Sequence, residues 1–313
     1  MVNFRFHLVS LTAVFLALAA GIAIGAGVVD RQTVDFLEDR LRTVENNRQQ
    51  TNAENDRLRG DIDVWRRFGE QAGDGLIQGR LQEIPVLLVG VDGTERELVE
   101  RLRTSMQAAG AAVQGSVWLT GRWSLSNSDD VQRLAEVTGA SATTRPNDLR
   151  SLALGQLVSG WSGGTLDALL ALRAAGFVEY DPPPGEPLAI EQVRFAESTI
   201  AIVGSAAATT PSTDLVVPFA AALIGADMKV LATEPSVVVD AEGSDDDTPP
   251  PVGAALALRQ RNDLAGVVST VDNIGEFRGR MAAVLAVAAL QEERTGHFGT
   301  GEGAQRLLPE PGA

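Results

Sequence analysis

A continuous heptad pattern follows a long apolar segment near the N-terminus, and it constrains the fold more than any other feature of the chain. Positions a and d are occupied in order by Val34, Leu37, Leu41, Val44, Arg48, Thr51, Asn55, Leu58, Ile62 and Trp65. Apolar residues that recur every 3.5 positions bury a seam between helices, and a polar a residue such as Asn55 fixes register and strand number. The pattern predicts a coiled coil about 47 Å long.

Charges beside this seam favour a parallel homodimer in register. Each g residue and the following e residue of a partner would form the pairs Arg40–Glu45, Asn47–Asn52, Glu54–Arg59 and Asp61–Arg66. Three of these pairs are opposite in charge, one is neutral and none is repulsive, which is typical of parallel two-stranded coiled coils. The alternative is a single amphipathic helix that packs on its own domain.

The apolar segment before the heptads, Leu8–Val29, is long enough to cross a membrane. It contains no charged residue and would extend about 33 Å as a helix. Arg5 and His7 precede it and Asp30 follows, so the positive-inside rule predicts a cytoplasmic N-terminus and an external remainder of the chain. A cleaved signal peptide is the alternative interpretation of this segment.

Small residues recur every fourth position along the predicted span, at Ala13, Ala17, Gly21 and Gly25. This spacing lets two helix backbones approach closely in a membrane. An anchor rich in Ala and Gly without any helix contact would show the same pattern. Because the heptads that follow also predict a parallel pair, we expect Ala17, Gly21 and Gly25 to lie in the same dimer interface as the a and d residues.

Composition excludes several classes of function. The net charge is −15 and Lys229 is the only lysine, which argues against nucleic-acid partners and against a second contact with anionic lipid beyond the anchor. The chain contains no cysteine, which excludes disulfides, zinc fingers and thiol chemistry.

The remainder of the chain predicts a Rossmann-like α/β domain with a mainly parallel sheet. Continuous apolar runs at Ile84–Gly90, Thr199–Gly204 and Leu264–Ser269 are typical of strands buried on both faces. Further strands are expected at 112–119, 177–180, 230–231 and 237–239, and helices at 94–110, 128–139, 165–175, 211–223, 254–261 and 281–290. Within them, Thr94–Glu97 reads as a capping box and Ser128 as an N-cap.

These patterns divide the chain into an anchor, a rod and one large domain. We expect a cytoplasmic stub and transmembrane helix at 1–29, the coiled coil at 30–68, a glycine-rich break and hinge at 69–83, and the external domain at 84–313. This domain comprises one sheet or two lobes with a boundary near 181–198. The acidic, proline-rich stretch Asp240–Pro251 reads as a solvated loop rather than a calcium site, because it lacks EF-hand spacing.

Residues that carry chemistry are scarce. Gly93 and Ser205 follow buried strands, where α/β folds place ligands, but neither lies in a dinucleotide-binding or P-loop motif. The only histidines are His7 and His297, and no G-x-S-x-G elbow occurs. We therefore assign no catalytic residue, cofactor site or metal site. An enzyme that uses the Gly93 or Ser205 loop remains a third alternative.

The two ends of the chain resemble a known family. Val2–Ala19 (VNFRFHLVSLTAVFLALA), Ser269–Asn273 (STVDN), Gly279-Arg280 and Gly296–Gly299 (GHFG) are similar to the corresponding ends of actinobacterial proteins named for mycobacterial copper transport protein B. The resemblance implies a group described as outer-membrane copper transport proteins. It also implies relatives that act in the cell envelope with a membrane partner, influence peptidoglycan hydrolases and serve the separation of daughter cells.

The C-terminal part of this pattern contributes Asp272, Asn273 and His297 as motif residues of unknown role. From their local sequence alone, Asp272 and Asn273 are expected to cap the helix that follows them. His297 is expected to make a local turn contact within its glycine-rich surroundings.

The residues bear unequally on the two functions that the resemblance implies. Copper(I) prefers Cys and Met sulfur or His nitrogen. The chain has no cysteine, and Met106, Met228 and Met281 fall in separate segments. The sequence therefore favours a non-enzymatic, dimeric, membrane-anchored envelope scaffold that binds a protein partner, and copper homeostasis is the alternative.

Overall fold

The computed structural model describes residues 4–185, 188–235 and 252–310, and it describes residues 4, 26–35, 70 and 74 as backbone only. Contacts divide the chain into two compact units, 1–67 and 68–313. The helices are α1 (Phe4–Ile77), α2 (Arg96–Ala108), α3 (Ser128–Thr138), α4 (Pro146–Gly163), α5 (Asp167–Ala174), α6 (Val216–Gly225), α7 (Ala254–Arg259) and α8 (Phe277–Gln291). The strands are β1 (Pro85–Val91), β2 (Ala112–Leu119), β3 (Val178–Asp181), β4 (Thr199–Val203), β5 (Val230–Thr233), β6 (Ser269–Val271) and β7 (His297–Phe298).

The second unit contains one mostly parallel sheet of seven strands. Its order is β3-β2-β1-β4-β5-β6-β7, and only β3 pairs in the antiparallel sense. Strand order reverses between β1 and β4, as in doubly wound folds. The expected α/β class and mainly parallel sheet are confirmed. The strands before and after 181–198 also join the same sheet, so the described residues do not divide into two sheets at that boundary.

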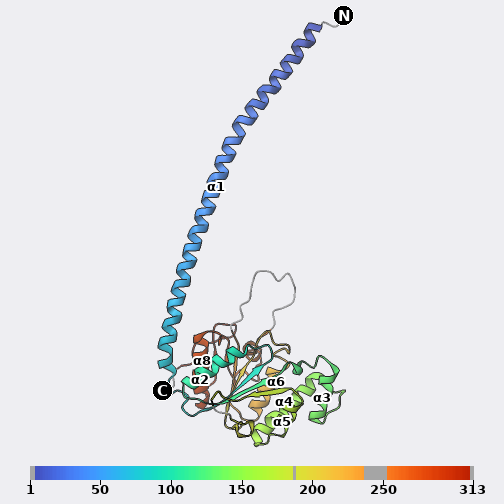
Figure 1. Cartoon of the computed structure of the whole chain (residues 1–313), viewed down its shortest axis with the longest axis vertical. Helices are drawn as coiled ribbons and strands as arrows, with labels where there is room; N and C mark the ends of the chain where they lie inside the picture. Colours follow the sequence, from blue (N-terminus) through green and yellow to red (C-terminus); the bar gives the residue numbers. More distant parts are fainter. Residues whose placement is uncertain (1–3, 186–187, 236–251, 311–313) are drawn as a thin grey trace. The chain divides into compact units, whose positions relative to one another are not determined.

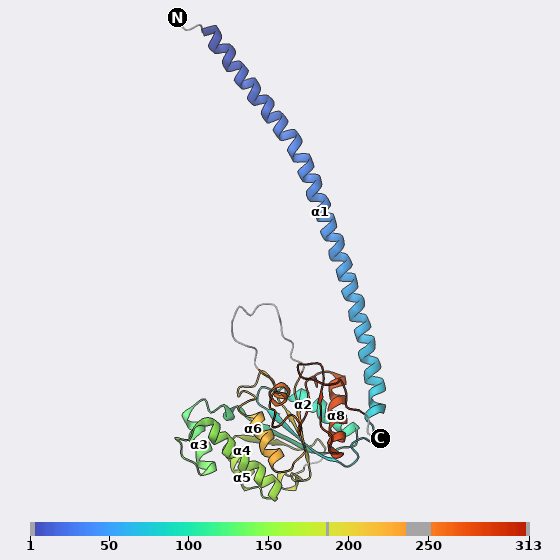
Figure 2. The same cartoon turned by 180° about the vertical axis from the view of Figure 1, so that it is seen from behind.

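Helices cover both faces of the sheet because the buried strands are apolar on both sides. Along β1, Val86 and Leu88 belong to one core cluster with α2 and α8. Leu87 and Val89 belong to another cluster that α3, α4, α5 and α6 cover. Figures 1 and 2 show α2 beside α8 and α4 beside α5 and α6 from opposite sides.

The predicted helix break at Gly69 is wrong. α1 continues to Ile77 through the glycines at 69, 73 and 75. Gly73 explains part of the difference, because a Cβ there would lie 2.3 Å from the Phe277 ring and 2.6 Å from Met281 Sδ. The glycine lets the helix pack closely against α8, and this packing supports the helix where its sequence is weak.

Several other local predictions also need correction. Thr94 donates to Val203 O (3.1 Å) and forms no capping box, while Asn127, not Ser128, caps α3. Pro211 lies in a turn ahead of α6. The Leu264–Ser269 run forms turns and only its last residue enters β6, and α4 was not predicted at all. The acidic stretch Asp240–Pro251 and the predicted strand Val237–Val239 lie outside the described residues.

Candidate functional site

The heptad face of α1 is the first candidate site, because its apolar residues remain exposed in the single chain. Leu41 is 68% exposed and Ile62 is 64% exposed. The other described apolar a and d residues, which are also exposed, are Leu37, Val44, Leu58 and Trp65. Arg48, Thr51 and Asn55 lie exposed between them, and Val34 has no described side chain. α1 therefore presents an exposed row of a and d residues from Leu37 to Ile62, apolar at both ends and polar in the middle.

Ion pairs on α1 join residues one helical turn apart. Examples are Arg42 with Glu38 (3.8 Å) and Arg66 with Asp63 (3.0 Å). Such exposed pairs contribute little to stability. The pairing between helices that the heptads predict stays a prediction.

The membrane-span prediction is supported by one helical stretch, Arg5–Gly25, which is long and apolar enough to cross a membrane. Within it, a Cβ added at Gly21 or Gly25 would meet nothing in the chain within 4 Å. Glycine costs about 1 kcal/mol relative to alanine inside a helix. Contacts within the described chain thus give no reason for these glycines, whereas a closely approaching second helix would.

A buried polar cluster at the carboxyl ends of β5, β6 and β7 is the second candidate site. Arg259 from α7 lies at its centre, with a side chain that is 3% exposed. Its Nε donates to Thr270 Oγ1 (2.8 Å) and its Nη1 donates to Asp272 Oδ2 (2.7 Å). The guanidinium also donates to the carbonyl oxygens of Phe298 (2.9 Å) and Glu302 (2.8 Å). Arg259 thus joins α7, β6 and the C-terminal segment.

Asp272 accepts hydrogen bonds from the C-terminal loop and does not cap α8. The backbone N–H groups of Thr300 and Gly301 donate to its two carboxylate oxygens at 2.8 and 2.9 Å. The N-cap of α8 is Glu276. The predicted capping role of Asp272 is therefore wrong, because this carboxylate binds a loop distant in sequence.

Asn273, the next residue, is also buried. Its backbone oxygen accepts from Glu276 N (3.0 Å), and its Oδ1 has no hydrogen-bond partner among the described residues. A Cβ on Gly279 would lie 1.9 Å from the Asn273 backbone oxygen. The glycine of the Gly279-Arg280 motif is thus explained by the close approach of α8 to this turn.

His297 lies within β7, so the predicted turn contact is wrong. It is 6% exposed, it pairs with Thr270 in register, and its Nδ1 lies 3.0 Å from Thr270 Oγ1. Burial, with the positive charge of Arg259 nearby, lowers the pKa of His297. The structure thus brings Asp272 and His297 together through Arg259 and Thr270, whereas sequence reasoning missed both of these intermediaries.

Glu234 completes the cluster directly after β5. It is 4% exposed, and burial raises its pKa to about 7, although Ala255 N donates to Oε2 at 3.1 Å and opposes the shift. Four of the five N–H donors of Arg259 and both oxygens of Asp272 are already engaged within the chain. This saturation favours a structural role for the cluster, in which it fixes the C-terminal segment to the sheet.

The chain's own loops fill the region where strand order reverses. Gly93 has φ +83°, and a Cβ there would lie 2.7 Å from Ala207 O. Thr209 Oγ1 donates to Asp92 Oδ2 across the same gap, and Ser205 Oγ accepts from Ala207 N (3.1 Å). The Gly93 and Ser205 loops, which would form the site of an enzyme in the third alternative, therefore pack against each other.

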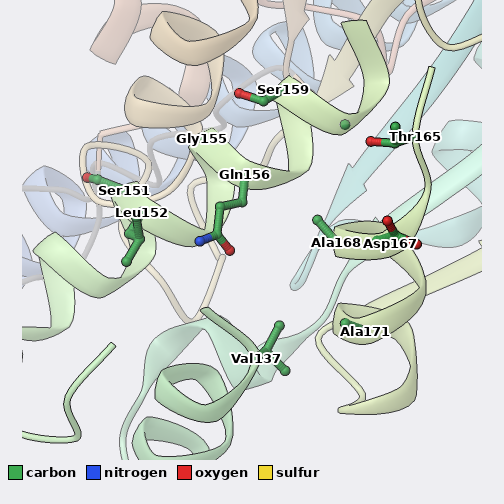
Figure 3. Close-up of a pocket in the computed structure, with 11 residues that line it drawn as sticks. Val137, Ser151, Leu152, Gly155, Gln156, Ser159, Thr165, Asp167, Ala168 and Ala171 are labelled. Carbon is green, nitrogen blue, oxygen red and sulfur yellow. The ribbon is translucent and has the colours of Figure 1, made fainter. Parts of the chain in front are cut away.

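An open groove of about 760 Å³ lies between α3, α4 and α5 (Figure 3). Leu152, Gly155 and Gln156 from α4 line it, together with Val137 from α3 and Ala168 from α5. Sequence reasoning did not find this groove because it did not find α4.

No group of three or more His, Asp or Glu side chains that could hold a metal ion occurs among the described residues. Met106 and Met281 both lie in the core cluster beneath α2 and α8, and Met228 lies in the other cluster. Met106, Met228 and Met281 are thus all buried in apolar surroundings.

Comparisons with known proteins agree along nearly the whole chain. The family model described as "Copper transport outer membrane protein, MctB" matches residues 1–309. Proteins named copper transporter MctB from Mycobacterium tuberculosis and Mycobacterium bovis are 26% identical over 332 residues, covering 98% of this chain and 99% of each relative. The protein of that name from Mycobacterium leprae is 25% identical over 327 residues, with the same coverage.

Proposed function

This chain belongs to the MctB family of copper transport outer membrane proteins, and we propose that it is a membrane-anchored, dimeric scaffold of the cell envelope. The scaffold is non-enzymatic and binds a second envelope protein. The observation that carries the proposal is the exposed heptad stripe of α1, on which Leu41 and Ile62 are each more than 60% exposed. Burying such side chains between two helices is favourable by about 1.5–3 kcal/mol for each one fully buried.

The second copy of the chain is the partner that this stripe fits. The pairs Arg40–Glu45, Glu54–Arg59 and Asp61–Arg66 complement each other only when two helices run parallel and in register. The small face of the span supports the same arrangement, since Gly21 and Gly25 have open space around them. The dimer would thus form in the membrane and continue along α1.

The proposed topology places the N-terminus in the cytoplasm and the α/β domain on the external side. Arg5 and His7 before the span and Asp30 after it support this orientation. A dimer carries two copies of every surface of the domain, so a partner with two epitopes would gain affinity through bivalency. Daughter-cell separation is the envelope process that we propose for this scaffold.

Copper handling is the second candidate function, and it rests on the names of the relatives. Proteins aligned over nearly their entire length are named copper transporters. Copper would then be cargo that the dimer or its partner conveys.

Complementation of a clean deletion in the host, in low-copper medium, tests the scaffold. We expect the deletion to leave chains of unseparated cells, and wild-type protein to restore separation. A Leu41→Asp, Ile62→Asp variant disrupts the seam and should fail to complement. Gln50→Asp, at an outward c position of the same helix, should complement as the matched control.

Two outcomes would contradict the scaffold. If cells that carry the deletion separate normally but accumulate or lose copper, copper handling becomes the favoured function. If the seam variant is present at wild-type level and complements fully, dimerisation through α1 is not needed for the function.

A further inference from the structure

The last turns of α1 are built into the α/β domain. Ile77 is 1% exposed and Leu81 is fully buried, and both belong to the core cluster beneath α2 and α8. Gly73 lies against Phe277 and Met281 of α8 so closely that no Cβ fits between them. This segment is therefore a fixed part of the domain, although it continues the helix that carries the heptads.

Two apolar residues of these turns are exposed. Leu76 is 56% exposed, and Ala72 is also exposed. Counting by heptads from Ile62, an a residue, places Ala72 at d and Leu76 at a. Gly73 and Ile77, which pack against the domain, fall at e and b. Gly69, at a, is half-buried, and a Cβ there would lie 3.8 Å from the Phe277 ring. The helix thus packs on its own domain through one side and leaves Ala72 and Leu76 exposed.

We propose that the dimer seam continues in phase to Leu76, so that the second copy of the chain covers Leu76 and Ala72 and joins the two α/β domains directly. In a parallel pair in register, each a residue meets its own counterpart, so Leu76 packs against Leu76 of the other copy. This inference rests on the proposed parallel dimer and deepens it, because it assigns Ala72 and Leu76, at the end of α1, to an interface with the same partner.

The residue types along this extension fit a second copy. Gly69 and Ala72, the a and d residues before Leu76, are small enough for close approach of two helices. The next residues at g and e, Phe68 and Gly73, carry no charge, so no like charges oppose each other there. In the sequence, the heptad phase continues without insertion from Val34 to Leu76.

The consequence is a paired domain rather than two domains on flexible tethers. Because Gly73 and Ile77 fix α1 to the domain core, a seam at Leu76 fixes the two domains relative to each other. A bivalent partner would then meet two copies of each surface at one set spacing, which is the condition for a large gain from multivalency.

Disulfide cross-linking tests this inference in a chain that has no native cysteine. Leu41→Cys probes the coiled coil, and Leu76→Cys probes the end of α1 that is packed on the domain. Gln71→Cys is the matched control, at an exposed outward c position of the same turns. Each full-length variant is incubated in membranes with a glutathione redox buffer and separated on a non-reducing gel. We expect L41C and L76C to form disulfide dimers in several-fold higher yield than Q71C.

The outcomes separate this inference from the proposed dimer. If L41C cross-links strongly and L76C only as weakly as Q71C, the seam ends within the rod and the inference is overturned while the dimer stands. If neither L41C nor L76C exceeds Q71C, the dimer itself fails. A disulfide between L76C and a different protein, without homodimer, would also overturn the second copy as the occupant. All three positions are exposed, so the melting temperature of the domain should match wild type.

Discussion

At the scale of single residues, Arg259 determines how the C-terminal segment is held. Its buried guanidinium bonds to Asp272, Thr270 and two carbonyl oxygens of the last segment. Breaking a buried ion pair by removing one partner leaves an uncompensated charge. The motif residues Asp272 and His297 thereby belong to one internal network.

Replacing Arg259 with alanine should destabilise the full chain by about 3–5 kcal/mol, because Asp272 would remain buried and unpaired. The free energy of unfolding from urea denaturation measures the effect. Arg261→Ala is the control, since Arg261 pairs with Asp263 at the exposed surface, and we expect no measurable change there. Equal stability of the two variants would show that the buried pair contributes nothing.

Glu234 should make stability depend on pH. Its pKa rises from 4.5 to about 7 in the folded chain, so the folded state keeps a proton that the unfolded state releases between these values. Stability is therefore full below pH 4.5 and falls as the pH rises to about 7. Glu234→Gln removes this loss, which is on the order of 3 kcal/mol.

Urea midpoints of wild type and E234Q at pH 5 and pH 8 measure this difference. The advantage of the variant should widen from the lower to the higher pH. The lowered pKa of His297 acts in the opposite direction, since burial disfavours its charged form as the pH falls, but it is present in both proteins and cancels. A gap that is the same at both pH values would contradict the assignment to Glu234.

At the scale of elements, the strands were easier to predict than the helices rich in small residues. Continuous apolar runs identified β1 and β4, because a strand that is buried on both faces has no alternation of apolar and polar residues. α4 was missed because Ser151, Gly155 and Ser159 give its outer face the composition of a loop. Pro146 at its first turn was the available signal.

The apolar run Leu264–Val268 was misread for a different reason. Leu264 and Val268 are buried, and Val268 N donates to Leu264 O (3.1 Å), so the run forms helical turns ahead of β6. A short apolar segment is compatible with the period of a strand and with that of a helix, and only tertiary contacts decide between the two structures. The polar cluster was unpredictable likewise, because Arg259 meets Asp272 only once α7 and β6 have packed.

Two glycines of α4 should respond oppositely to alanine. A Cβ at Gly155 would meet nothing within 4 Å, whereas a Cβ at Gly160 would lie 2.8 Å from Thr165 O. Gly155→Ala should stabilise the domain by about 1 kcal/mol through helix propensity. Gly160→Ala should destabilise it by about 1–3 kcal/mol through overpacking. Thermal unfolding of both variants checks the pair, and destabilisation by G155A would contradict the open space assigned to that position.

At the scale of the whole molecule, the proposed dimer combines a strong seam at both ends with a weak one in the middle. Leu37, Leu41 and Val44 precede the polar a and d residues, and Leu58 and Ile62 follow them. A buried polar residue at a lowers stability but disfavours other registers and strand numbers, since only one alignment pairs it with itself. The central polar residues would thus specify the pairing that the apolar ends stabilise.

Asn55→Leu tests this division of roles. Leucine at this a position buries more apolar surface, so the melting temperature of the α1 helical signal should rise. The same change removes the residue that specifies register, so cross-linking should show species larger than dimers, or a lower yield of the in-register L41C dimer. Gln50→Leu, at an outward c position, should change neither quantity. If N55L changes neither the dimer order nor the yield of cross-linked dimer when it is combined with L41C, Asn55 does not lie in the seam. The heptad assignment from Val34 must then be abandoned.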